Sequence, residues 1–391
     1  MRPETLTRRV GAGLSVSPEA AEAAGEAARE AAAALGGAPV DLAFLFLSAD
    51  HFAGAEVALD AVEEELAPAH VLGCVAEGVV ARDRELEDGP AAAVWAASLP
   101  DAVIETFESV ALDTDEGIAV TGIPNLDDAD LVTLLVDPFT YPAAGFLSKL
   151  NEEEGAVPLV GGLAAGDGEP DTQALFRDGE VLYEGAVGAV IRGVPVRTVV
   201  SQGCEPVGRD SVITNAEDNV VFELAGERAL ERLKGDLGTL TPEQERSAAR
   251  GGVLAGLVID ENRADYRRGD YLMRGLVGVD EETGALAVGE AVRIGQTLRF
   301  HVRDATSADA DLRENLSAAL NGERAAGTLL FTCNGRGTNL FSSPDHDARV
   351  AAELLGGDSL AGFFCAGEIG PVGGKPFLHG FTATAAIFLE S

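Results

Sequence analysis

The sequence predicts a mixed α/β fold in which layered mixed sheets are flanked by helices. Three times along the chain, a short apolar strand is followed by a helix, a second apolar strand and a turn of small residues that carries an acid. Nearly continuous apolar runs of this length are typical of strands covered on both faces. Alternating segments at 185–191, 194–201 and 291–302 indicate antiparallel strands. We therefore expect βαβ-like units combined with antiparallel strands.

The first unit follows an alanine-rich helix that the sequence predicts over 17–35. Ser17 is a suitable N-cap before Pro18, and Gly36-Gly37 ends the helix. The apolar run Val40–Leu47 then predicts a buried strand. A helix is expected over 51–66 and a second strand around 70–74.

The second and third units repeat this order. The second has a strand at 130–136, a helix at 141–151 and a strand from Val157, and the third has the corresponding elements at 327–333, 345–355 and 360–368. The turns that follow read GCVAEG, GGLAAGD and CAGEIG. This recurrence predicts a weak internal duplication of the strand-helix-strand unit. The alternative is that glycine ends strands in many α/β proteins.

Two polar helices expected at 226–235 and 242–251 could join two halves of the chain. We predict a boundary near 218–223. The expected organisation is an N-terminal helical segment over 1–37, one module over 38–222 and a related module over 223–391.

The charge balance excludes several classes of function. The chain has 391 residues, with 28 basic and 65 acidic residues and a formal net charge of −37. Such a surface repels nucleic acids and anionic membranes. No run of 18 apolar residues and no signal-like apolar core occur, so we expect neither a transmembrane helix nor export. The four cysteines have no CxxC spacing, which favours a reduced cytoplasmic protein without a metal, a disulfide framework or a cofactor.

Three stretches of the C-terminal third are the most specific part of the sequence: DYLMRGLVGVD at 270–280, LLFTCNGRG at 329–337, and GFFCAGEIGP with KPFLHGFTAT over 362–384. Together they resemble the C-terminal module of the FIST family (F-box and intracellular signal transduction proteins). LAFLFLS at 42–48, LGCVAEG at 72–78 and VGGLAAGD at 160–167 resemble its N-terminal module. The resemblance implies a sensory domain that binds small ligands such as amino acids. No F-box, kinase or cyclase segment is visible, so a ubiquitin-ligase role is not expected.

The residues of the recurring turns are the candidates for ligand binding. Arginine offers a planar fork of donors to a carboxylate, a glutamate can hold an ammonium group, and strand-end glycines let a ligand approach the backbone. The structural alternatives are tight packing for glycine and cysteine and a solvated surface for the charged residues. The candidates are Gly73, Cys74, Glu77, Gly162, Asp167, Arg274, Asn334, Arg336, Cys365, Glu368 and His379.

We therefore expect a sensory protein that binds a small molecule between the two modules and signals to a separate protein partner. A second hypothesis is a hydrolase or transferase in which Cys365 is the nucleophile and His379 the base; it requires a thiol with a low pKa. A third is a scaffold that binds a protein through an exposed apolar patch. The sequence does not decide whether the protein is an enzyme, and it favours a role without catalysis.

Overall fold

The computed structural model describes residues 7–115, 117–153, 156–263 and 265–390. Strands account for 43% of the chain and helices for 24%, so the predicted mixed α/β class is confirmed. The chain forms two compact units. Unit 1 comprises Met1–Val200, Leu312–Leu378 and Thr382–Ser391, and unit 2 comprises Ser201–Asp311 and His379–Phe381. Unit 2 is therefore almost entirely an insertion in the sequence of unit 1.

Unit 1 is built from three repeats, which begin at residues 9, 103 and 196; the end of β14 and the start of α6 in the third repeat extend into the residues grouped with unit 2. The first contains β1 (Arg9–Ser15), α1 (Ala20–Leu35), β2 (Leu42–Ser48), α2 (Ala55–Leu66), β3 (Val71–Ala76), β4 (Val79–Ala81), β5 (Arg84–Leu86) and β6 (Ala92–Ser98). The second contains β7 (Val103–Thr114), β8 (Gly117–Thr121), β9 (Leu131–Val136), α3 (Ala143–Glu153), β10 (Leu159–Leu163), β11 (Leu175–Arg177), β12 (Glu180–Leu182) and β13 (Ala186–Arg192). The third contains β14 (Val196–Gln202), α6 (Ala305–Leu320), β22 (Ala325–Cys333), α7 (His346–Leu355), β23 (Leu360–Cys365), β24 (Glu368–Val372), β25 (Lys375–His379) and β26 (Thr382–Leu389).

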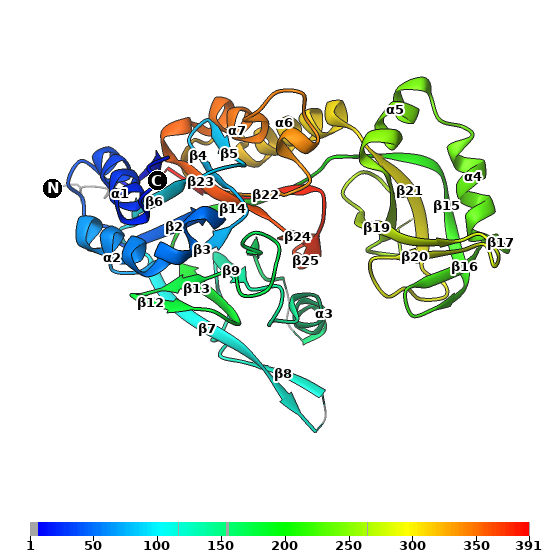
Figure 1. Ribbon diagram of the computed structural model, residues 1–391, viewed down its shortest axis with the longest axis horizontal. Coiled ribbons are helices and arrows are strands. Elements are labelled where there is room, and N and C mark those ends of the chain that lie inside the picture. Colours follow the sequence, from blue (N-terminus) through cyan, green and yellow to red (C-terminus); the bar gives the residue numbers. More distant parts are fainter. Residues whose placement is uncertain (1–6, 116, 154–155, 264, 391) are drawn as a thin grey trace. The chain divides into compact units, whose positions relative to one another are not determined.

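The three repeats build three sheets of the same order (Figure 1). Each sheet is centred on a pair of parallel strands joined by a crossover helix, namely β2 and β3, β9 and β10, or β22 and β23. The last strand of the same repeat pairs antiparallel with the first strand of the parallel pair. A hairpin pairs antiparallel with the second strand of the parallel pair. The predicted duplication of the strand-helix-strand unit is therefore present.

The hairpin of each sheet comes from another repeat. Hairpin β4–β5 of the first repeat joins the sheet of the third, β11–β12 of the second joins the first, and β24–β25 of the third joins the second. Each repeat thus gives one hairpin and receives another. No repeat completes its sheet with its own residues alone, so the three repeats must fold together.

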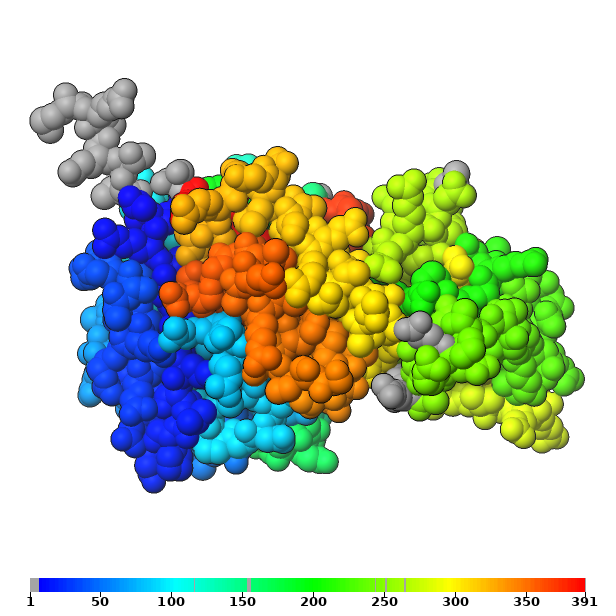
Figure 2. Space-filling view, turned by 90° about the horizontal axis from the view of Figure 1, so that it is seen from above, coloured from blue at the N-terminus to red at the C-terminus, as the bar shows by residue number. Residues whose placement is uncertain are grey.

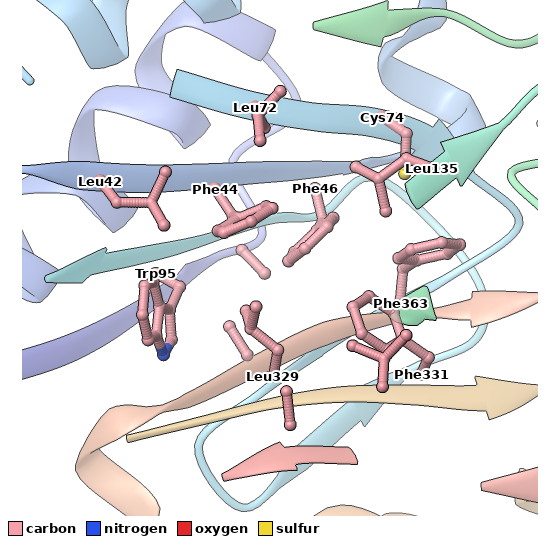
Figure 3. Packing of buried hydrophobic residues seen from close by; sticks show 14 of the residues in the cluster. Leu42, Phe44, Phe46, Leu72, Cys74, Trp95, Leu135, Leu329, Phe331 and Phe363 are labelled. Atoms are coloured by element: carbon pink, nitrogen blue, oxygen red, sulfur yellow. The ribbon is translucent and has the colours of Figure 1, made fainter. Parts of the chain in front are cut away.

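The inner faces of the three sheets form one apolar core. It contains Phe44 and Phe46 from β2, Leu135 from β9, and Phe331 and Phe363 from the third repeat (Figure 3). The outer face of each sheet packs separately under helices of its own repeat. These are α1 and α2 in the first repeat, α3 in the second, and α6 and α7 in the third. The strands of the central pairs are buried on both faces, which explains their nearly continuous apolar sequences.

A glycine marks the same position in all three parallel pairs. Gly73, Gly161 and Gly362 lie opposite a leucine of the neighbouring strand, and a Cβ on them would lie 1.9, 1.9 and 1.6 Å from the leucine carbonyl oxygen. Close packing of backbone on backbone therefore requires these glycines. For Gly73, this packing explains the residue without a ligand.

Unit 2 contains a closed antiparallel barrel. Its strands are β15 (Cys204–Glu217), β16 (Val220–Leu224), β18 (Val253–Val258), β19 (Tyr271–Asp280), β20 (Ala285–Val288) and β21 (Thr297–Arg303), accompanied by β17 (Glu227–Arg228), α4 (Ala229–Leu237) and α5 (Pro242–Gly251). The long strand β15 pairs with β21 and also with β16, which closes the ring. Closure leaves no unpaired edge between these strands.

The predicted elements are found with shifted ends. The first helix begins at Ala20 with Glu19 as N-cap, so the prediction of a cap at Ser17 was wrong. Segment 1–37 contains strand β1 as well as a helix, and the boundary predicted between 222 and 223 falls inside β16. Unit 2 is inserted within the third repeat, and no change in composition marks where the insertion begins or ends. Among the described residues, no helix has the length and apolar character needed to cross a membrane.

The packing of the equivalent glycines can be tested with a matched pair of substitutions. Gly362→Ala forces a Cβ against the Leu330 carbonyl, and we expect it to lower the free energy of unfolding by about 1–3 kcal/mol or more. Gly145→Ala, in helix α3 with no atom within 4 Å of the new Cβ, should instead raise it by up to about 1 kcal/mol. Urea unfolding of the full chain measures both. Equal effects of the two substitutions would contradict the assignment.

Candidate functional site

A cluster of charged side chains lies at the end of β22 in unit 1. The loop after this strand lies against hairpin β4–β5 of the first repeat and the N-terminus of α7. Figure 2 shows the hairpin, in light blue, beside α7, in orange. We call these side chains the polar cluster: Glu77, Glu85, Glu87, Asn334, Arg336, Asp347 and Glu368.

The centre of the polar cluster is an ion pair with no solvent exposure. Arg336 donates from Nε to Asp347 Oδ2 at 2.6 Å and from Nη2 to Oδ1 at 2.8 Å. Thr332 and His346 also bond to the Asp347 carboxylate. The ring of Phe341 lies 5.3 Å from the guanidinium carbon. Both sides of the pair are thus fixed by neighbours, as a buried charge pair requires.

Three glutamates of the first repeat surround this pair. Glu77 accepts a hydrogen bond from Asn334 Nδ2, and Glu87 accepts from the backbone N–H and the hydroxyl of Thr338. Glu85 accepts from the N–H of Ala348 at the N-terminus of α7. Helix N-termini favour negative charge, so this bond lowers the pKa of Glu85 and opposes in part the effect of burial. The hairpin exchange is therefore what brings these acids to the arginine.

Several buried polar atoms of the cluster lack a hydrogen-bond partner. Within residues 7–390 as described, they are Arg336 Nη1, Glu85 Oε2, Glu368 Oε1 and Asn334 Oδ1. The other oxygen of Glu368 accepts two bonds from Thr382. A buried polar group without a partner costs about 1–3 kcal/mol. One such atom on the arginine and three on the side chains of its cluster indicate a place where a polar ligand would complete the bonding.

Comparison of the repeats shows that the fold does not require these acids. Glu368 pairs with Gly162, and the equivalent positions in the other two hairpins hold Val79 and Leu175. By the same comparison, the position of Glu85 is held by Val181 in the second repeat. Buried carboxylates thus stand where the same architecture elsewhere uses apolar side chains.

The environment separates the acids by their pKa values. Burial raises the pKa of Glu85 and that of Glu368 to about 8; the charge of Asp347 adds to the effect on Glu85, whereas hydrogen bonds from Thr382 oppose it for Glu368. Burial acts the same way on Asp347, but the charge and hydrogen bonds of Arg336 outweigh it and hold that pKa well below its usual range. The cluster thus combines ionised and protonated carboxyl groups at neutral pH.

Three of the predicted strand-end residues, Cys74, Gly162 and Cys365, lie together in a packed interior. Cys74 and Cys365 belong to the same core and interact electrostatically, and a Cβ on Gly162 would lie 2.3 Å from Cys365 Sγ. Two of the predicted site residues, Glu77 and Asn334, are bonded to each other, a contact that the sequence did not predict. Packing alone therefore explains why Cys74, Gly162 and Cys365 occupy these positions, without the ligand-binding role that the sequence predicted for them.

Other predicted site residues have different environments. The fork of Arg336 is occupied by Asp347, so it does not offer two free donors to a ligand carboxylate. Asp167 is exposed and accepts a bond from the N–H of Glu169 in its own turn. Arg274, on β19 of unit 2, pairs with Glu290. His379 is 2% exposed at the end of β25 and is also grouped with unit 2.

The hypothesis of a cysteine nucleophile is not supported by this environment. Cys365 is completely buried, and burial raises the pKa of its thiol well above the usual value. Nucleophilic cysteines need the thiolate and access to substrate. Cys365 has the opposite properties, which are those of a small apolar core residue.

Sequence reasoning missed Glu85, Glu87 and Asp347. Glu85 and Glu87 lie in a polar stretch, RDRELEDGP, that reads as solvated surface. Asp347 sits in the first turn of a helix, where acids are common. The signal that could have found Glu85 and Glu368 is the repeat comparison, but it needs the strand register.

Comparisons with known proteins agree with the motifs. A model of the FIST N domain matches residues 41–227, and a model of the FIST C domain matches residues 229–371. The chain belongs to the FIST family. FIST domains are in general sensory modules that bind small ligands in signalling. An uncharacterized protein of Mycobacterium tuberculosis is 44% identical over 98% of this chain and 100% of its own, and one of Mycobacterium bovis is 42% identical over 98% and 99%.

Both FIST domains contribute to the polar cluster. The FIST N match includes Glu77, Glu85 and Glu87, and the FIST C match includes the arginine, Asp347 and Glu368. The two domains of the family are therefore not the two compact units: unit 1 contains parts of both. The family boundary at residues 227–229 lies within unit 2.

The raised pKa of Glu368 predicts a pH-dependent stability. In the folded protein this pKa rises from 4.5 to about 8, so the folded state holds a proton that the unfolded state loses. The contribution is fully present below pH 4.5 and is lost as the pH rises through 8, by up to about 1.4 kcal/mol per pH unit. Glu368→Gln should remove this loss and gain stability relative to the native protein as the pH increases.

Urea unfolding at pH 5 and pH 8.5 measures this difference. Glu184→Gln, which neutralises an exposed acid, is the matched control and corrects for the general repulsion among the acids. If the Glu368→Gln variant and the native protein change in parallel between the two pH values, Glu368 is not protonated in the folded state.

Proposed function

We propose that this protein is a sensor that binds a small ligand carrying an ammonium group at the polar cluster, and that it signals to a separate protein partner. Amino acids and related small metabolites are the proposed ligand class. The single observation that carries the proposal is the set of buried acids around Arg336 at positions where the other repeats use apolar residues.

The charges of the cluster determine the chemistry of the ligand. The charge of Arg336 acts on the carboxyl groups of Glu85, Asp347 and Glu368, and its fork is already taken by Asp347. Glu77 and Glu87 add two further carboxyl groups at the edge of the cluster. The cluster therefore has more carboxyl groups than cations, so a cationic group completes it better than an anionic one. Arg336 Nη1 remains as a donor to an oxygen of the same ligand, and Asn334 Oδ1 remains as an acceptor for one of its N–H groups.

Access is supported by the outer part of the cluster. Glu77 is exposed and Asn334 and Glu87 are half-buried, whereas Glu85, Arg336 and Glu368 lie beneath them. The Glu77–Asn334 bond joins the first and third repeats over this inner layer. A ligand that replaces this bond would change how the two repeats are held together, which gives a physical route from binding to a change of shape.

The test is a thermal-shift screen of the full chain against the twenty protein amino acids and simple diamines. A ligand at about 100 times its Kd stabilises the folded state by about 2.7 kcal/mol. Glu77→Gln and Asn334→Ala should each weaken a hit about 10-fold or more, because each removes a charge-assisted or amide hydrogen bond. Arg336→Ala is unsuitable, since it leaves Asp347 buried without its partner.

Asp167→Asn is the matched control, because Asp167 is an exposed acid in the corresponding turn of the second repeat. It should leave the affinity unchanged. A hit that binds equally well to the Glu77 and Asn334 variants does not use the polar cluster. Absence of any hit at millimolar concentration would contradict the proposed ligand class.

A further inference from the structure

The second repeat lacks a helix that the other two repeats have. In the first repeat, α1 packs beside the crossover helix α2; a Cβ on Gly54 would lie 2.5 Å from the Ala20 Cβ, and one on Gly25 would lie 4.0 Å from that of Ala61. In the third repeat, Leu312 and Leu316 of α6 pack with residues of α7. The second repeat has strand β8 and the loop 122–130 at this point of the chain (Figure 1).

A groove of about 860 Å³ lies beside the crossover helix of the second repeat, and we call it the α3 groove. One of its walls includes Pro142, the residue just before α3, and Lys149 of α3. Counted from the first residues of the two crossover helices, these positions correspond to Gly54, the residue just before α2, and Ala61 of α2, and α1 covers both. The groove is therefore open on the side where the first repeat holds a helix. Its lining is Ile118, Ala119, Val120, Ile123, Pro124, Asn125, Leu126, Asp127, Pro142, Gly145, Phe146, Lys149 and Leu150.

We propose that the α3 groove docks an amphipathic helix of a partner protein, with an apolar stripe flanked by basic side chains. The molecule itself provides the precedent, because two of its three equivalent positions are filled by a 16-residue helix. Ten of the thirteen lining residues are apolar or glycine. Ile118 at the groove is 63% exposed, as expected of a side chain that awaits a partner.

Charge indicates the polar face of the incoming helix. In the first repeat, Arg29 of α1 pairs with Glu65 of α2 at 3.3 Å, and in the third, Arg313 of α6 pairs with Glu353 of α7 at 2.9 Å. In both, the first helix supplies the cation and the crossover helix the acid. The charged residues of the α3 groove itself are Asp127 and Lys149, one of each sign. The preference for a basic segment therefore comes from the pattern of the other two repeats and from the net charge of −37, which attracts a basic segment and repels an acidic one. A basic amphipathic helix in an apolar groove is a common recognition mode.

The docking site is distinct from the polar cluster and does not depend on the ligand proposed there. It lies entirely in the second repeat, whereas the cluster acids and arginine come from the first and third. Loss of ligand binding and loss of helix docking can therefore be measured separately.

The test uses a labelled 16-residue peptide and fluorescence anisotropy with the full chain. Its leucines follow the spacing of Leu312, Leu316 and Leu320 in α6, and its opposite face carries lysines. A control peptide has the same composition in an order that breaks the apolar stripe. The proposal predicts saturable binding of the first peptide and at least tenfold weaker binding of the second.

Two substitutions locate the binding. Gly145→Gln adds a side chain at the groove where a Cβ meets nothing within 4 Å, and Ile118→Gln removes an exposed apolar wall. Each should weaken the striped peptide about tenfold or more. Gly235→Gln, at a helical glycine of α4 with open space, and Ile294→Gln, at a 65% exposed isoleucine, are the matched controls and should leave binding unchanged.

Four results would overturn the proposal. The first is equal binding of the two peptides, which would indicate attraction by charge alone. The second is no saturable binding of the striped peptide at high micromolar concentration, and the third is binding that the two groove variants leave unchanged. The fourth is a concentration-dependent dimer of the native chain that Ile118→Gln dissociates, which would assign the groove to a second copy.

Discussion

The exchange of hairpins among three repeats is the constraint on which the rest of unit 1 depends. Each parallel strand pair has a free edge that only the hairpin of another repeat completes, so the three sheets form together around one apolar core. Backbone groups on a buried edge must find partners, which makes the exchange obligatory once the strands are buried. The exchange also carries residues about 260 positions apart into contact, as in the bond from the Glu85 N–H to Asp345.

The polar cluster follows from this constraint. Hairpin β4–β5 carries Glu85 from the first repeat to α7 of the third, beside Arg336 and Asp347. A buried ion pair of this kind is weak evidence for stability, because its desolvation cost is comparable to the attraction gained. In the other hairpins of unit 1, apolar residues occupy the positions that correspond to Glu85 and Glu368. The acids therefore need an explanation other than folding, and ligand recognition provides one.

The sequence predicted the strand-helix-strand units because their apolar runs and glycine turns are local signals. It also predicted the contact partners Glu77 and Asn334 as site residues, although not their bond. It could not predict the role of Arg336, because nothing near Arg336 in the chain indicates that Asp347 and a hairpin from residue 85 enclose it. The barrel of unit 2 was missed for a similar reason: its closure depends on the long-range pairing of β15 with both β16 and β21.

The central claim is that an ammonium-bearing ligand binds among carboxyl groups that are partly protonated in the free protein. Calorimetric titration of a screened ligand near pH 7, repeated in buffers of different ionisation enthalpy, measures the protons exchanged on binding. The account predicts a net release of protons, because a cation beside Glu85 or Glu368 lowers the pKa of a group that burial had raised to about 8. Binding with heats independent of the buffer would contradict it.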